Sequence, residues 1–216
     1  MHVKLISHSS ANEAEYDLSS ALDLVAYCAR VSNPSNQSNK ETNAKLVQYL
    51  IKHKHWSPLE MVSVCLEIKT TRDIARQILR HRSFSFQEFS QRYADPTTDL
   101  SFELREARLQ DPVNRQNSLD TASVGLQYEW EQKQRSVILA AKDAYDFAIS
   151  KGIAKEQARC VLPEGNTVSV MYVNGTLRSW VHYIDLRISN GTQLEHMEIA
   201  NEVAKIIATI FPLNKV

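Results

Sequence analysis

Cations, aromatic rings and one carboxylate are interleaved between Arg80 and Tyr93. Arg80, His81 and Arg82 are consecutive, Ser90 follows after seven residues, and a fourth cation stands two residues later. A solvated charged run would not carry this many aromatic rings, and a core segment would not carry four potential cations. Guanidinium groups bind phosphates through paired hydrogen bonds and stack on flat rings. The stretch is therefore typical of a site for a flat, anionic ligand such as a nucleotide.

The backbone conformation decides which of these side chains act together. Consecutive residues in a helix point about 100° apart, so the three adjacent cations cannot all bind one phosphate. They can serve ligand groups on different sides. Glu88, Ser90 and Arg92 share a face if the segment is extended, but they separate if it is helical, and the sequence leaves both arrangements open.

His53 and His55 are two residues apart, so they share a side in an extended segment. They could bind a metal ion, but there is no third ligand and no thiol nearby, so we expect no metal site. The simpler interpretation is a polar turn, with Pro58 ending the preceding helix before a strand begins.

Arg178 and His182 are four residues apart and share a helix face, whereas Arg187 lies roughly opposite them on a straight helix. Apolar residues occupy the remaining sides of this segment. A helix with polar residues on two sides is unusual at the surface of a monomer. It suits a position between subunits with a ligand on each side. The alternative for His182 is a core histidine with satisfied hydrogen bonds.

Arg159 and Cys160 lie in a short predicted helix that ends before Pro163. Arg159 could be a solvated or ion-paired surface residue. Cys160 has no neighbouring base and no helix start that would lower its pKa, so we interpret it as a core residue. No Cys, Ser or Lys is placed beside a base, and the chemistry must then come from a cofactor and from positioning.

Taken together, these motifs resemble those of the flavin-dependent thymidylate synthases (the ThyX family). The family signature of Arg-His-Arg, seven residues and Ser occurs at 80–90 and continues with Glu88, Arg92 and Tyr93. The residue before the glutamate is usually Asn and is Gln87 here. Three further family motifs follow the family order: His55-x-Ser57-Pro58-x-Glu60, Arg159-x-x-Leu162-Pro163, and Arg178, His182 and Arg187.

Two positions depart from the family pattern near the end of the chain. The Asn of a family Asn-x-Arg step falls on Thr176, with Asn174 nearby as the alternative. A His that often precedes Gln193 is replaced by Gly191, while Glu195 is retained.

The resemblance implies reductive methylation of dUMP to dTMP without an enzyme nucleophile. Methylenetetrahydrofolate would give the carbon unit, NADPH would reduce bound FAD, and Arg187 would be catalytic. It implies homotetramers whose active sites are shared between chains. The implied FAD-binding residues are His55, Ser57, Arg80, His81, Arg82, Glu88, Thr176, Arg178 and His182. The implied dUMP-binding residues are Gln77, Arg80, Glu88, Phe89, Ser90, Gln91, Arg92, Arg159 and Arg187.

Composition limits the alternatives. The 216 residues include 25 Lys plus Arg and 25 Asp plus Glu, so the net charge is zero, whereas bulk nucleic-acid binders are usually basic. With only five glycines and no Gly-rich phosphate loop, arginines would have to hold phosphates. Three separated cysteines and the lack of a signal or membrane-spanning segment favour a cytoplasmic protein. An RNA- or phosphate-binding module and an interaction protein with an ion-paired arginine face remain as alternatives.

Hydrophobic periodicity predicts the elements that position these residues. With the resemblance, these elements imply an α+β fold like that of the ThyX family: a single domain over 1–216, with a mostly antiparallel sheet flanked by long helices. Predicted strands cover 3–8, 61–70, 99–109 and 167–173, and polar loops cover 33–39 and 111–120. Predicted helices cover 17–29, 42–54, 70–80, 123–150, 153–163 and 177–189, the last closed by Asn190 and Gly191, and a final helix runs from 193 to Pro212.

Overall fold

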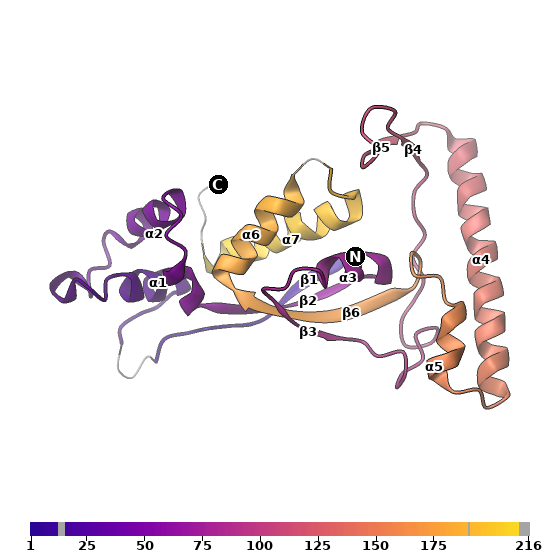
Figure 1. The fold of residues 1–216 in the computed structure, drawn as a ribbon, viewed down its shortest axis with the longest axis horizontal. Coiled ribbons are helices and arrows are strands. Elements are labelled where there is room, and N and C mark those ends of the chain that lie inside the picture. Colours follow the sequence, from indigo (N-terminus) through magenta and orange to yellow (C-terminus); the bar gives the residue numbers. More distant parts are fainter. Residues whose placement is uncertain (13–15, 190, 212–216) are drawn as a thin grey trace.

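Four antiparallel strands form the central sheet of the computed structural model, which describes residues 1–12, 16–189 and 191–211 (Figure 1). Their order is β1 (His2–His8), β2 (Ser63–Thr71), β6 (Val168–Thr176) and β3 (Ser85–Glu88). All three neighbouring pairs are antiparallel, which confirms the predicted sheet type. Along β2 the side chains of Val64, Leu66 and Ile68 are fully buried and alternate with partly exposed ones, as the sequence pattern predicted.

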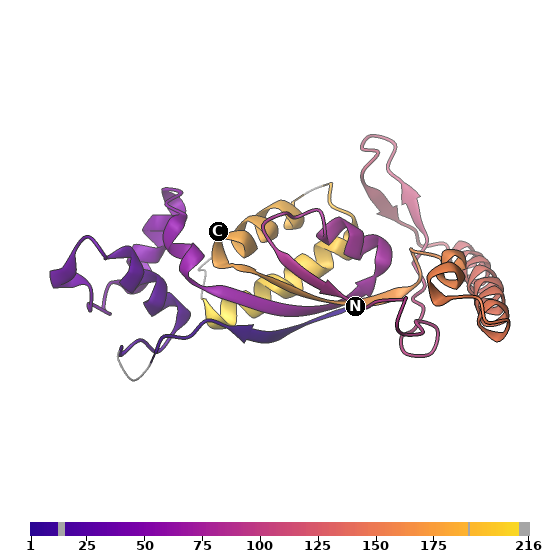
Figure 2. The same ribbon diagram turned by 60° about the horizontal axis from the view of Figure 1, so that its bottom comes forward.

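Three helices cover one face of this sheet: α3 (Arg72–Ile78), α6 (Leu177–Ile188) and α7 (Leu194–Ile210) (Figures 1 and 2). Their apolar sides and the β2 and β6 side chains make the main core. Trp180 of α6 is 1 % exposed, and its indole N–H donates to the carbonyl of Val64 at 3.0 Å. The core therefore ties α6, which carries three predicted site residues, directly to the sheet.

At one end of the sheet lie α1 (Ala21–Ala29), α2 (Asn43–Lys52) and the short helices η1 (Pro34–Asn36) and η2 (Ser57–Met61) (Figure 1). The predicted helix over 17–29 begins later than expected. Ser20 caps it by accepting a hydrogen bond from the backbone N–H of Asp23 at 3.1 Å, so Asp17 lies outside the helix.

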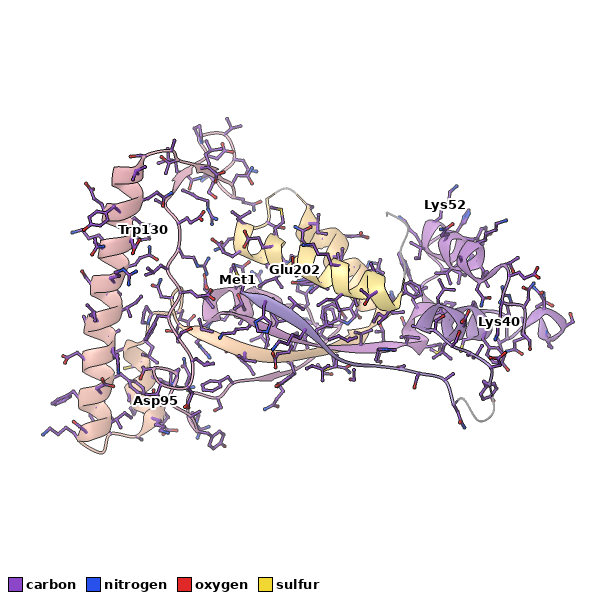
Figure 3. The ribbon with its side chains drawn as sticks, turned by 180° about the vertical axis from the view of Figure 1, so that it is seen from behind. Met1, Lys40, Lys52, Asp95, Trp130 and Glu202 are labelled. Atoms are coloured by element: carbon purple, nitrogen blue, oxygen red, sulfur yellow. The ribbon has the colours of Figure 1, made fainter. Side chains whose placement is uncertain are left out.

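At the other end lies α4 (Val124–Ser150), a helix of 27 residues capped by Ser123, with α5 (Lys155–Ala158) and η3 (Arg159–Val161) packed against it. Only four of the side chains of α4 are buried. Large apolar side chains including Trp130, Val137 and Leu139 are exposed on it, and Figure 3 shows Trp130 at the end of the molecule far from α1 and α2. The chain itself leaves much of the apolar surface of this helix uncovered.

The predicted strand over 99–109 is wrong for most of its length. Phe102 forms a single bridge with Thr167, and only β4 (Arg108–Gln110) is a strand, paired with β5 (Ser118–Asp120) inside the predicted loop over 111–120. Elsewhere the backbone is bonded to side chains: Gln134 of α4 accepts from the backbone N–H of Arg105 at 2.7 Å and donates to its carbonyl at 2.8 Å. Apolar alternation does not distinguish such a side-chain-bonded segment from a strand.

The helix predicted over 70–80 ends earlier than expected, because α3 ends at Ile78 and Arg80 lies beyond it. Thr71 occupies the N-cap position of α3. Arg72 pairs with Glu88 at 3.2 Å and Arg76 pairs with Glu164, so carboxylates of this chain offset both charges. Asn190 and Pro212, the predicted helix ends, lie outside the described residues.

Candidate active site

The Arg80–Phe84 turn joins α3 to β3 and lies over the covered face of the sheet. It begins with the backbone N–H of His81 donating to the carbonyl of Ile78 at 3.0 Å, and Phe84 N–H donates to the carbonyl of His81 at 3.3 Å. The Phe84 ring is 8 % exposed and stands 4.4 Å from the Trp180 ring, centroid to centroid. Burial of Phe84 thus anchors the turn while Arg80 and Arg82 remain exposed.

Gly175 of β6 makes this anchoring possible. A Cβ atom at this position would lie 2.3 Å from Cδ1 of Phe84, well inside van der Waals contact. The ring therefore occupies space that only glycine leaves free. The close approach of strand and ring fixes the height of the turn above the sheet.

The predicted catalytic arginine is hydrogen-bonded to His81, the second residue of this turn. Nε of Arg187 donates to Nε2 of His81 at 2.9 Å, which requires an unprotonated Nε2 and places the ring proton of neutral His81 on Nδ1. Burial, then the charges of Arg187 and Arg80, lower the pKa of His81 to about 4. Burial also lowers the pKa of Arg187. The imidazole is therefore neutral at neutral pH and holds a partly buried cation in one orientation.

Behind this pair lies a buried polar cluster that the sequence reasoning did not identify. His196 of α7 is fully buried, with Nδ1 3.1 Å from Oε1 of Gln77 and Nε2 3.1 Å from the hydroxyl of Tyr183. Burial, then the charges of Arg187 and His81, bring the pKa of His196 to about 3. A signal was present in the sequence, because His196 falls on the same helical stripe as Ile199, Ala200 and Val203.

A second group of predicted residues lies where η2 meets the start of α6. Glu60 is ion-paired with Arg178, and the ring of Trp56 lies 4.5 Å from the ring of His182. His182 is exposed, so the core-histidine alternative is wrong. This group faces away from Arg187, as the spacing along α6 predicted.

Residues next to this second group have separate surroundings. His55 and His53 are exposed and lie beside the ring of Tyr49, while Ser57 is exposed at the start of η2. Thr176 is the N-cap of α6, and its hydroxyl accepts from the backbone N–H of Ser179 at 3.3 Å. That oxygen is therefore engaged in helix capping, whereas the neighbouring Asn174 is exposed.

A third group lies at the end of β3, beside α5. Glu88 accepts from Ser169 at 2.8 Å, and Arg92 is ion-paired with Glu156 at 3.2 Å. The chain leaves the extended conformation after Glu88 and turns at 91–93, so the shared face of an extended 88–92 segment is not formed. Ser90 instead accepts from the backbone N–H of Arg92 at 3.3 Å.

Other members of the third group differ in exposure. Phe89 is half-buried and its backbone N–H donates to the carbonyl of Val170 at 2.8 Å. Gln91 is 5 % exposed, and its Nε2 has no partner among the described residues. Arg159 begins η3 and is half-buried. Cys160 beside it is exposed, so its interpretation as a core residue is wrong.

The ion-pair pattern separates arginines that already have a carboxylate partner from arginines that do not. Within residues 1–12, 16–189 and 191–211, no carboxylate forms an ion pair with Arg80, Arg82, Arg159 or Arg187, whereas Arg72, Arg76 and Arg105 are paired. Arg30 and Arg115 likewise form no ion pair with a carboxylate of the described residues, but only the first four are among the residues expected to contact FAD or dUMP. Unpaired guanidinium groups fit the diphosphate of FAD and the phosphate of a nucleotide.

The three groups do not converge within one chain. η2, which contains Ser57 and Glu60, lies at the α1 and α2 end of the sheet, and β3, which ends at Glu88, leads toward the α4 and α5 end (Figure 1). α6, which carries Arg187, lies over the sheet between these ends (Figure 1). β3 and β6 run side by side between these two ends. Ser85 pairs with Asn174 near the end of β6 that leads into α6, whereas Glu88 of the third group pairs with Met171 further back along β6. One chain thus presents parts of a site at three places.

Comparison with known proteins identifies the family. The profile of the family described as "Thymidylate synthase complementing protein" matches residues 15–213. The chain is 50% identical over 189 residues to a flavin-dependent thymidylate synthase of Synechocystis sp., covering 88% of this chain and 85% of the relative. It is 33% identical over 193 residues to a flavin-dependent thymidylate synthase of Thermus thermophilus, covering 88% of this chain and 68% of the relative.

Solved structures agree on the fold. The UMP/dUMP methylase PolB from Streptomyces cacaoi, solved with 5-Br dUMP, superposes with a TM-score of 0.80 at 24% identity, covering 96% of this chain and 90% of that one. The motifs, the fold and these matches lead to one conclusion: the chain belongs to the flavin-dependent thymidylate synthase family.

Proposed function

We propose that this chain methylates dUMP to dTMP as a single FAD-dependent domain. Methylenetetrahydrofolate is the carbon donor and NADPH is the reductant. The observation that carries the proposal is the set of unpaired arginines around the Arg80–Phe84 turn, with Arg187 held by a neutral imidazole. The similarity to flavin-dependent thymidylate synthases supports the choice of reaction.

Each group of residues has a separate task in this proposal. Arg187 places a fixed positive charge beside the uracil ring, where negative charge develops when the ring is ionised. Arg92 and Arg159 bind the nucleotide phosphate, with Ser90 as an added donor. A phosphate at this position would replace Glu156 as the partner of Arg92.

The FAD-binding set is drawn from the other two groups. Arg80, His81, Arg82 and Arg178 bind FAD, and His55 and His182 pack against it. Bound FAD, once reduced, supplies the hydride that completes the methyl group. The residues that touch FAD therefore lie on both sides of α6.

We also propose that the active protein is a homotetramer whose sites combine residues of several chains. The separation of the three groups in one chain supports this, as do the exposed apolar side chains of α4. Large exposed apolar patches are typical of interfaces. Within the described residues no helix has the length and apolar character needed to cross a membrane. A cytoplasmic location is the prediction of the sequence.

The first test is an absorbance spectrum of the purified protein with FAD. We expect a flavin spectrum that NADPH bleaches and that returns on re-oxidation, and formation of dTMP from dUMP when methylenetetrahydrofolate is added. A protein that binds neither FAD nor dUMP contradicts the proposal. Strong, salt-dependent RNA binding without flavin would instead favour the nucleic-acid-binding alternative.

Mixing two inactive variants tests whether the site is shared. Arg178→Ala and Arg187→Ala act on opposite sides of α6, and each should be inactive alone. If the two residues reach one site from different chains, mixed oligomers contain some intact sites and activity returns. If one chain supplied both residues, every site in the mixture would lack one of them and activity would stay absent.

A further inference from the structure

A continuous chain of hydrogen bonds connects α6, α3 and α7 behind the candidate site. It runs from Tyr183 to His196, Gln77, Gln193 and Glu195, with distances of 3.1, 3.1, 2.8 and 2.9 Å between successive polar atoms. Tyr183, His196 and Glu195 are 1 %, 0 % and 5 % exposed. Solvent therefore has little access to most of its members.

Glu195, at the acidic end, determines the donor-to-acceptor direction of these hydrogen bonds. Glu195 is ion-paired with Arg105 at 2.9 Å and with Arg108 at 2.5 Å. Burial opposes ionisation, but the backbone N–H of Glu195, then Arg105, Gln193 and Arg108, lower the pKa of this carboxyl. An ionised carboxylate only accepts hydrogen bonds, so the amide nitrogen of Gln193 must face it.

The orientation of the Gln193 amide determines the orientation of each following residue in the chain of hydrogen bonds. With its nitrogen toward Glu195, Gln193 turns its oxygen to the amide nitrogen of Gln77, and Gln77 turns its own oxygen to His196. His196 must then carry its proton on Nδ1, and its bare Nε2 accepts from the hydroxyl of Tyr183. Every donor points toward Glu195.

We infer that this chain of hydrogen bonds positions Gln77 by fixing which end of its side-chain amide faces the nucleotide. The inference rests on the proposed function, in which Gln77 contacts dUMP. One N–H of Gln77 is used by Gln193, and its other N–H has no acceptor among the described residues. Gln77 is half-buried, so this N–H is the donor that it offers to an acceptor oxygen of dUMP. If the side-chain amide of Gln77 were free to rotate, its oxygen instead of its N–H would at times face the acceptor oxygen of dUMP, and the two oxygens could not form a hydrogen bond.

Two substitutions at His196 separate positioning from packing. His196→Phe keeps a ring but removes the donor to Gln77, and we expect the KM for dUMP to rise about tenfold, the loss of one hydrogen bond, with kcat nearly unchanged. His196→Asn can place an amide N–H near the position of Nδ1 and should restore KM to within about threefold of the wild type. FAD content and thermal stability are measured for both variants.

The outcomes separate this inference from the proposed function. If folded His196→Phe binds dUMP like the wild type, or if His196→Asn is as impaired as His196→Phe, the positioning role is wrong. A wild-type protein that binds no FAD and makes no dTMP would instead overturn the proposed function.

The tautomer of His196 gives a test that needs neither activity nor a variant. In ¹⁵N-histidine-labelled wild-type protein, we expect the His196 signals of a neutral ring protonated at Nδ1 and bare at Nε2. A ring protonated at Nε2 would reverse the direction of the chain and overturn the inference even in a fully active enzyme.

Discussion

Arg187 donates its Nε–H to Nε2 of His81 at 2.9 Å, so the guanidinium is oriented by a neutral imidazole instead of a carboxylate. A carboxylate would neutralise the charge that the proposed reaction needs, whereas an imidazole orients the group and leaves its charge available. Arg187→Ala should therefore abolish dTMP formation while FAD remains bound, as measured by product formation and flavin absorbance. Arg135→Ala, which removes an exposed arginine of α4, is the matched control. Residual turnover in Arg187→Ala would remove this residue from the chemistry.

The two buried imidazoles make stability depend on pH. The pKa values of His81 and His196 are about 4 and 3, against 6.5 for an ordinary histidine. Between pH 6.5 and 4 the unfolded chain therefore binds more protons than the native protein. We expect the free energy of unfolding to fall as the pH is lowered through this window and, for these two groups, to be constant above it.

Urea titrations at pH 7 and pH 5 measure this dependence. His196→Asn removes one of the two imidazoles and should show a smaller difference between the two pH values than the wild type. His8→Gln removes an exposed histidine and serves as the control. Equal pH dependence in wild type and His196→Asn would show that His196 binds its proton in the native state as readily as in the unfolded chain, which contradicts the lowered pKa.

Gly175 should tolerate no side chain. Gly175→Ala places a Cβ atom 2.3 Å from the Phe84 ring, and overpacking of this kind destabilises by roughly 1–3 kcal/mol. Because Phe84 anchors the turn that carries Arg80 to Arg82, FAD affinity should fall as well. Gly125→Ala is the control, since it lies in α4 with nothing within 4 Å and alanine favours a helix. Wild-type stability of Gly175→Ala would contradict the proposed anchoring.

Arg92→Ala should weaken dUMP binding by about 1.5–3 kcal/mol, the range for a hydrogen bond to a charged group. Its partner Glu156 is half exposed, so the ion pair itself contributes little to stability. Glu156→Gln removes the competing carboxylate and should leave dUMP binding equal or tighter. Dissociation constants from calorimetry decide between these outcomes, and an unchanged value for Arg92→Ala would exclude a phosphate contact.

Cys160→Ser should retain turnover. The thiol is exposed and no hydrogen bond links it to a base among the described residues. Burial raises the pKa of the other two thiols, Cys28 and Cys65, which makes them poorer nucleophiles. Steady-state rates of the three single Cys→Ser variants test this, and complete loss of activity in a folded variant would identify a thiol nucleophile.

The sequence predicted the regular elements best where one face is buried. β2 follows its hydrophobic pattern, and the opposite placement of Arg178 and Arg187 follows from helix geometry alone. α4 matches the helix predicted over 123–150, although most of its apolar side chains are exposed. The 99–109 segment was misassigned because its backbone bonds to Gln127 and Gln134, which are remote in sequence. The apolar stripe of α7 indicated that His196 is buried, but its partners Gln77 and Tyr183 come together only in the folded chain, so the polar cluster could not be predicted.

The division between paired and unpaired arginines also determines how ligands approach. Overall charge is zero, so a distant polyanion experiences little net attraction. Close to the Arg80–Phe84 turn, guanidinium groups without carboxylate neighbours leave a local excess of positive potential whose range is about 10 Å at 0.1 M salt. A small dianion that diffuses within that range is steered inward, and its association rate should fall with ionic strength even though the protein as a whole has no net charge.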